Sequence, residues 1–257
     1  MKRKVDLPNT GVTVDLVVFP FQQMLLSLLT DPVALQPENL AFDLSDPFKV
    51  PNVGDDSAHV YDDFSTGHVH CEAWQRYCTQ PHDLLCEIML FMDKTYIDTK
   101  GKNTLEPVMM TLGIFNRSYR NRAEAWRPIG YMPNLMTWAP YKSVDARHRD
   151  FHHLLRIMLS ELAVLQQIGG LQWRFATPHN NEGFFPCQLQ IPVNCFMGDN
   201  EGNDKLCCRK GGGKGKKETG GRLCRYCNVL FEELGIHSRQ FGTKKRCVRK
   251  LEKCAIV

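Results

Sequence analysis

The sequence predicts an α/β protein in which helices flank a mixed sheet. An apolar run over residues 87–92 is too short for an ordinary helix and ends at Asp93, which indicates a buried central strand. A similar run over residues 189–198 again ends in an acid, Asp199. Apolar side chains at helical spacing over residues 150–167 indicate a long helix. Two buried strands and a helix packed on them give the α/β class.

The N-terminal part of the chain adds one helix. Residues 1–18 carry few periodic signals and are expected to form an extended arm. Pro20 precedes apolar residues at helical spacing over residues 21–29, which predicts a helix. Prolines interrupt residues 31–56, which predicts a loop-rich connector. Residues 1–56 therefore form an arm, a helix and a connector.

Further elements are predicted around the two acid-ended strands. A short helix precedes the first of them, and two more strands follow it after short turns, which predicts an antiparallel meander. The long helix has Asp150 as a suitable N-cap and glycines at its end, and one short strand follows it. The predicted ranges are 72–77 for the short helix, 107–116 and 125–132 for the two strands, and 170–175 for the last strand.

The order of these elements indicates a particular fold. Strand with acid, strand, strand, helix and strand with acid is the order of the ribonuclease-H-like fold. In that fold the first and fourth strands lie side by side, so that one acid on each can bind a shared divalent metal ion. Residues 57–206 are therefore interpreted as an incomplete ribonuclease-H-like core.

Asp93 and Asp199 each have two interpretations. A lone buried carboxylate is costly unless it is paired, hydrogen-bonded or bound to a metal. Asp93 is either a metal ligand or a strand-end carboxylate that accepts a hydrogen bond from a turn. Asp199 is either the second ligand or a solvated loop acid, because Glu201 and Asp204 follow it. Asp199 is preferred to these two because it directly follows the strand.

Composition restricts the function classes. The chain has 257 residues and a formal charge of +4, and much of its basic excess lies between residues 209 and 253, which suits a polyanionic partner. Its apolar runs are too short to span a bilayer and its first residues do not resemble a signal peptide, so we expect a soluble intracellular protein without a membrane partner. Eleven cysteines in that setting are expected to be free or metal-bound.

Residues 207–257 form a basic, cysteine-rich segment with a candidate zinc site. Cys224 and Cys227 have the spacing of half a tetrahedral zinc site, and Cys207 is a candidate further ligand. The alternative is a reduced cysteine pair at the start of a helix. Other candidate ligands are Cys208, His237, Cys247 and Cys254.

The same segment contains a basic, glycine-rich loop. Three roles are open for its lysines: a solvated surface, contacts with DNA phosphates that read no bases, or a nuclear-import signal. The lysines are Lys210, Lys214, Lys216 and Lys217.

Several ordered motifs resemble one transposase family. The chain is similar to the Plavaka-type members of the Kyakuja-Dileera-Zisupton transposases. The resemblance implies that Asp93 and Asp199 are the first and second acids of a DDE-type catalytic set that uses Mg²⁺ or Mn²⁺, with a third acid expected beyond the end of this chain. The motifs are residues 19–32, 91–95, 111–117, 125–131 and 198–207 and the pair Cys224 and Cys227.

Two function classes follow. The first is a C-terminally truncated, transposon-derived transposase fragment, located in the nucleus, whose ancestor cleaved and joined DNA strands with a metal ion and whose own activity is reduced or lost. In this class the chain could also form a homo-oligomer. The second is a non-enzymatic, zinc-containing DNA-binding or interaction module. An assay of metal-dependent strand cleavage separates the two classes.

Overall fold

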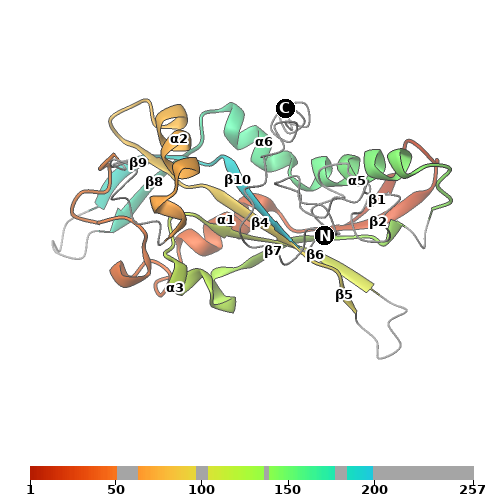
Figure 1. The fold of residues 1–257 in the computed structure, drawn as a ribbon, viewed down its shortest axis with the longest axis horizontal. Helices are drawn as coiled ribbons and strands as arrows, with labels where there is room; N and C mark the ends of the chain where they lie inside the picture. The colour runs from red at the N-terminus through yellow and green to blue at the C-terminus, as the bar shows by residue number, and fades with distance from the viewer. Residues whose placement is uncertain (51–62, 97–103, 136–138, 177–183, 199–257) are drawn as a thin grey trace, which may run out of the picture.

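The computed structural model describes residues 1–50, 63–96, 104–135, 139–176 and 184–198 (Figure 1). Its main sheet has the strand order β1-β2-β7-β6-β4-β10, and β5 pairs with one end of β6. The strands are β1 (Lys2–Asp6), β2 (Thr13–Val18), β4 (Ile88–Met92), β5 (Thr95–Tyr96), β6 (Thr104–Leu112), β7 (Arg127–Met132) and β10 (Val193–Gly198).

The centre of this sheet confirms the predicted meander. β4 pairs antiparallel with β6, and β6 pairs antiparallel with β7. On its other side β4 pairs in parallel with β10. Ile88, Leu90 and Met92 of β4 are almost fully buried, as expected of a central strand. The sheet is therefore mixed, and the two strands that precede Asp93 and Asp199 are neighbours.

Residues 1–18 form part of the main sheet and not an extended arm. β1 and β2 make an antiparallel hairpin, and β2 pairs with β7. Val14, Leu16 and Val18 are buried at alternate positions of β2, which is the period of a strand with one face on the core. For β1 our expectation failed because this strand buries only Val5 and carries almost no apolar alternation. For β2 it overlooked the apolar residues at positions 14, 16 and 18, which do alternate in the sequence.

A second sheet has the order β3-β9-β8. It consists of β3 (Asp83–Leu85), β8 (Leu171–Ala176) and β9 (Phe184–Gln190). The run over residues 189–198 is therefore not one strand, because the chain leaves β9 at Ile191-Pro192 before β10 begins. β3 runs parallel to β9 as β4 runs parallel to β10, so the two sheets are joined along one bent parallel pair.

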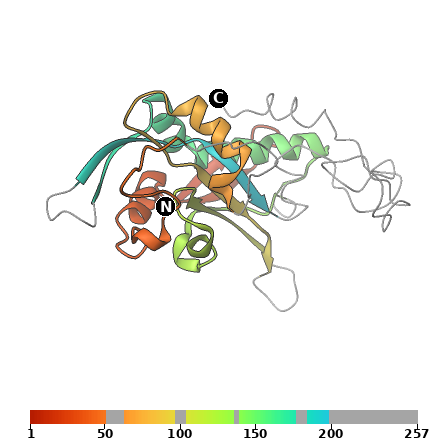
Figure 2. The same cartoon turned by 60° about the vertical axis from the view of Figure 1, so that its left-hand side comes forward.

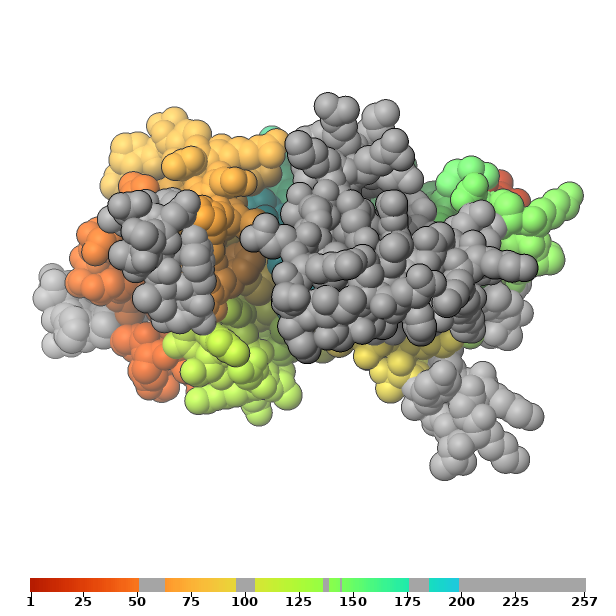
Figure 3. Space-filling model, in the orientation of Figure 1, coloured from red at the N-terminus to blue at the C-terminus, as the bar shows by residue number. Residues whose placement is uncertain are grey.

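Five α-helices and three short 3₁₀ turns are described. α1 and α5 both contact β7, α6 contacts α1 and α5, and α2 contacts β3 and β10 (Figures 1 and 2). In Figure 3, α2 (orange-yellow, upper left) and α3 (yellow-green, lower left) both lie in the left half of the view. The elements are α1 (Phe21–Leu29), α2 (His68–Tyr77), α3 (Arg117–Arg120), α5 (Val144–Met158), α6 (Ser160–Gln167), η1 (Pro37–Asn39), η2 (Phe64–Thr66) and η3 (Ala123–Ala125).

The long helix predicted over residues 150–167 begins earlier than predicted and is divided into α5 and α6 at Leu159. Ser143 is its N-cap, and the Ser143 hydroxyl accepts a hydrogen bond from the Ala146 N–H at 3.1 Å. Asp150 lies within α5, fully buried, where Oδ1 accepts hydrogen bonds from the Asn9 N–H and side-chain amide at 3.2 and 2.5 Å. Asp150 thus ties the turn of the β1–β2 hairpin to the helix. The charged first turns of α5 hid this start, because the apolar stripe begins only at Phe151.

Candidate functional site

Asp93 lies directly after β4, at the end of the strand nearest β5. Its side chain is half-buried, and its Oδ1 accepts a hydrogen bond from the Lys94 N–H at 2.7 Å. A local bond of this kind is what the turn interpretation of Asp93 expects. It occupies one of the two carboxylate oxygens, and an ionised carboxylate has acceptor capacity for further ligands.

The register of β4 and β10 brings the ends of these strands together. Met92 pairs with Gly198 in the parallel ladder, and the residues that follow them in sequence are Asp93 and Asp199. Residues that pair across a sheet point to the same face. Asp199 itself lies outside the described residues, so the predicted approach of the two carboxylates stays a prediction.

Glu106 on β6 is another acid close to this strand end, but it lies on the opposite face of the sheet. Met92 pairs with Val108 and Thr95 with Leu105, a register that sets Glu106 across from Lys94. Because side chains alternate along a strand, Glu106 and Asp93 point to different faces. Within the described ranges, no group of three or more His, Cys, Asp or Glu side chains could hold a metal ion.

A buried polar cluster that the sequence analysis missed lies at the other end of β4. Glu87 is fully buried, and the Nδ1 of His70 lies 3.0 and 2.9 Å from its two carboxylate oxygens. The Asn194 side-chain amide donates to Glu87 Oε1 at 2.9 Å and approaches the Val69 carbonyl at 3.4 Å. A Cβ at Gly113 would lie 2.7 Å from Glu87 Oε2, so glycine leaves room for the carboxylate.

One signal in the sequence pointed to this cluster. Glu87 stands between Cys86 and the apolar run of β4, so the cost of burying a carboxylate applies to it as it does to Asp93. Its partners come from α2 and β10, which are far away in sequence. Pattern alone therefore identifies the buried acid but not what pairs with it.

A model of the Plavaka transposase family matches residues 38–182, which is more than half of the chain. This chain belongs to the Plavaka transposase family. The matched region contains β4, Asp93 and Glu87 and ends before β9 and β10. A comparison with curated proteins found no match, and neither did a comparison with solved structures.

The described cysteines of this Plavaka-family chain are not suited to metal binding. Burial raises the pKa of Cys78 and Cys187 to about 12, with a smaller effect on Cys78 from the nearby Asp83 and Glu87 carboxylates. Burial likewise raises the pKa of Cys71, Cys86 and Cys195. Since the thiolate is the metal ligand and the nucleophile, a raised pKa lowers the reactivity of these thiols at neutral pH. The other predicted site residues, namely Cys207, Cys224, Cys227, Lys210, Lys214, Lys216 and Lys217, lie outside the described residues.

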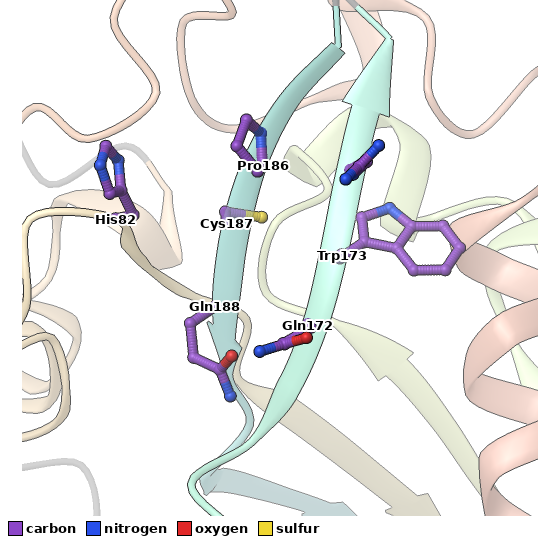
Figure 4. A pocket seen from close by; sticks show the side chains of 7 residues that line it. His82, Gln172, Trp173, Pro186, Cys187 and Gln188 are labelled. Carbon is purple, nitrogen blue, oxygen red and sulfur yellow. The ribbon is translucent and has the colours of Figure 1, made fainter.

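The described part of the Plavaka-family chain also has a hollow of about 740 Å³ on the second sheet. His82 and residues of β8 and β9 line it, and Figure 4 shows Trp173 turned away from His82. This sheet lies at the end of the molecule away from β5 (Figures 1 and 2). Among the helices described, none has both the length and the apolar character needed to cross a membrane.

Proposed function

We propose that this chain is the core of a DDE-type transposase, of the Kyakuja-Dileera-Zisupton group, that cleaves and joins DNA strands with Mg²⁺ or Mn²⁺. Membership of a transposase family supports DNA as the substrate. The observation that carries the proposal is the pairing of Met92 with Gly198 at the ends of two neighbouring strands, because an acid follows each of these residues in the sequence. An antiparallel meander with a parallel strand beside β4 also supports a ribonuclease-H-like core.

The residues at this edge fit a divalent cation in part. Carboxylate oxygens are the ligands that Mg²⁺ and Mn²⁺ prefer. The Lys94 N–H holds Asp93 Oδ1, which orients the carboxylate and leaves Oδ2 to bind the ion. A bound ion would polarise the phosphodiester and activate the attacking water or 3′-hydroxyl. Asp93 and Asp199 would supply negative charge from one face of the sheet.

The described residues contain no group of three or more side chains that could hold a metal ion, so the proposed activity is low unless an acid from another part of the chain completes the set. Glu232 and Glu233 are the candidates. The test is a gel assay with labelled duplex DNA in Mg²⁺, Mn²⁺ or EDTA. We expect slow nicking that needs the metal ion. DNA that stays intact with both ions, in a chain that binds neither, contradicts the proposal.

We propose a DNA-contacting role for the four lysines Lys210, Lys214, Lys216 and Lys217, and nuclear localisation of the protein. Replacing all four with Gln should lower the slope of log affinity against log salt by about 3 to 4, since each neutralised phosphate contributes about 0.9. Fluorescence anisotropy with a duplex at several salt concentrations measures this slope. Replacing Lys2, Lys4 and Lys49, which lie on the described surface, is the control and should change it little. An unchanged slope in the first variant removes this role.

We also propose that Cys224 and Cys227 bind a structural zinc ion, with Cys207 as a further ligand. Purified protein should contain about one zinc per chain, and replacing Cys224 and Cys227 with Ser should release it. Elemental analysis after dialysis measures the metal content. Cys78→Ser is the matched control, because burial keeps that thiol protonated. Protein without zinc, or zinc retained in the double variant, contradicts this site.

A further inference from the structure

The parallel pairing of β4 and β10 contains a β-bulge at Asn194. Val193 pairs with Ile88, but Cys195 pairs with Met89, so Asn194 is an extra residue on β10. Every later pair carries the same shift of one residue, as far as Gly198 with Met92. The alignment of the two strand ends is therefore set at the bulge, several residues earlier.

A regular ladder would give a different site. Continued from Val193 and Ile88 without an extra residue, it would set Gly198 beside Asp93 and Asp199 beside Lys94. A slip of one residue also turns every side chain to the opposite face of the sheet. With the bulge, the residues that precede Asp199 and Asp93, namely Gly198 and Met92, pair with each other. Without it, the two acids would point to opposite faces.

The buried cluster holds the bulged residue. The Asn194 amide donates to Glu87 Oε1, and the same carboxylate accepts from His70 on α2. The second Asn194 contact, to the Val69 carbonyl, also ends on α2. Glu87 has no exposed surface and His70 only 7%, so loss of the Asn194 contact would leave a buried carboxylate short of one partner. A regular ladder that included Asn194 would therefore lose the free energy of this hydrogen bond to the buried carboxylate.

We propose that Glu87 and His70 are positioning residues that hold Asn194 in the bulge and thereby align Asp199 with Asp93. The roles of the two acids rest on the proposed function. The register of β10 does not, and it is measured without any DNA cleavage.

Disulfide formation by Cys195 reports the register. Paired residues of neighbouring strands lie within disulfide distance, whereas Leu90 points to the other face of β4. Under mild oxidation the Met89→Cys chain should cross-link to Cys195 and the Leu90→Cys chain should not. Adding Asn194→Val, which removes the amide and favours a regular strand, should reverse this pattern. Deleting Asn194 removes the extra residue without a shift, so the Met89→Cys cross-link should persist. Peptide mass spectrometry identifies the linked cysteines.

Cleavage assays on the same variants, with Met89 and Leu90 intact, separate this inference from the proposed function. Asn194→Val should lower metal-dependent cleavage about a hundredfold through misplacement of Asp199, while the Asn194 deletion should stay near the parent chain. A Met89→Cys cross-link that persists in the Asn194→Val chain, with folding checked by circular dichroism, overturns the inference. A reversed cross-link with unchanged cleavage supports the register inference and overturns the roles proposed for Asp93 and Asp199.

Discussion

Replacing Asp93 with Asn should reduce metal-dependent DNA cleavage about a hundred- to thousandfold, because the variant loses the negative charge that would bind the ion. Asn has the same shape as Asp, and its side-chain oxygen can still accept the hydrogen bond from the Lys94 N–H. The local turn should therefore survive. The change tests the charge of Asp93 and not its packing.

The measurement is initial cleavage rate together with Mn²⁺ binding, so that a slow parent activity does not hide the result. Asp46→Asn is the matched control, since it removes one carboxylate from an exposed loop that precedes Asp93 by almost fifty residues in the sequence. Both chains should melt within a few degrees of the parent. If Asp93→Asn cleaves DNA and binds Mn²⁺ as the parent does, Asp93 is only the strand-end carboxylate of the alternative interpretation.

Gly170→Ala should destabilise the fold strongly, because the added methyl group has no space. Gly170 has a φ of 98°, and a Cβ there would lie 2.0 Å from the Leu189 carbonyl oxygen and 3.1 Å from the carbonyl carbon. Leu189 cannot move away easily, because it lies in β9, the central strand of the second sheet, and pairs with both Leu84 and Leu171. We expect the free energy of unfolding to fall by about 4 kcal/mol or more, from left-handed backbone strain and overpacking together.

Gly169 provides a matched control for this effect. It has a φ of 85°, but a Cβ there would meet nothing within 4 Å. Gly169→Ala should therefore cost only the backbone strain, about 1 to 2 kcal/mol. Urea denaturation of the two variants gives the difference directly. Equal losses would show that the close approach of Gly170 to Leu189 does not restrict the chain.

Sequence patterns predicted the centre of the fold because its elements are locally distinct. β4 is an unbroken apolar run, and the α1 helix has apolar residues at helical spacing after Pro20. β1 was missed because a strand at the sheet edge buries few side chains, whereas the alternation of β2 was present in the sequence and was overlooked. Pro192 lies between β9 and β10, and the apolar residues on both sides of it resembled one strand in the sequence. Contacts between segments far apart in the sequence determine where these strands lie, and a local sequence pattern does not show such contacts.

The candidate site was predictable to a similar degree. Asp93 stands out because it ends a buried strand, and the same reasoning applied to Glu87 would have found an acid that is fully buried. The bulge at Asn194 has no such signal, since an extra residue in β10 is visible only once β4 is beside it. The register of the two strand ends, Met92 with Gly198, is therefore a property of the pairing and not of either strand.

The pairing of β4 with β10 also has a consequence for synthesis of the chain. β6 and β7 follow β4 closely, so one edge of β4 can pair soon after it leaves the ribosome. Its other edge must wait for β10, about a hundred residues later, which at typical rates of translation is on the order of ten seconds. During that interval an apolar strand presents unpaired N–H and C=O groups, the kind of surface that chaperones bind and that other nascent chains can join. Until β10 is made, the open edge of β4 is therefore a place at which the new chain can aggregate.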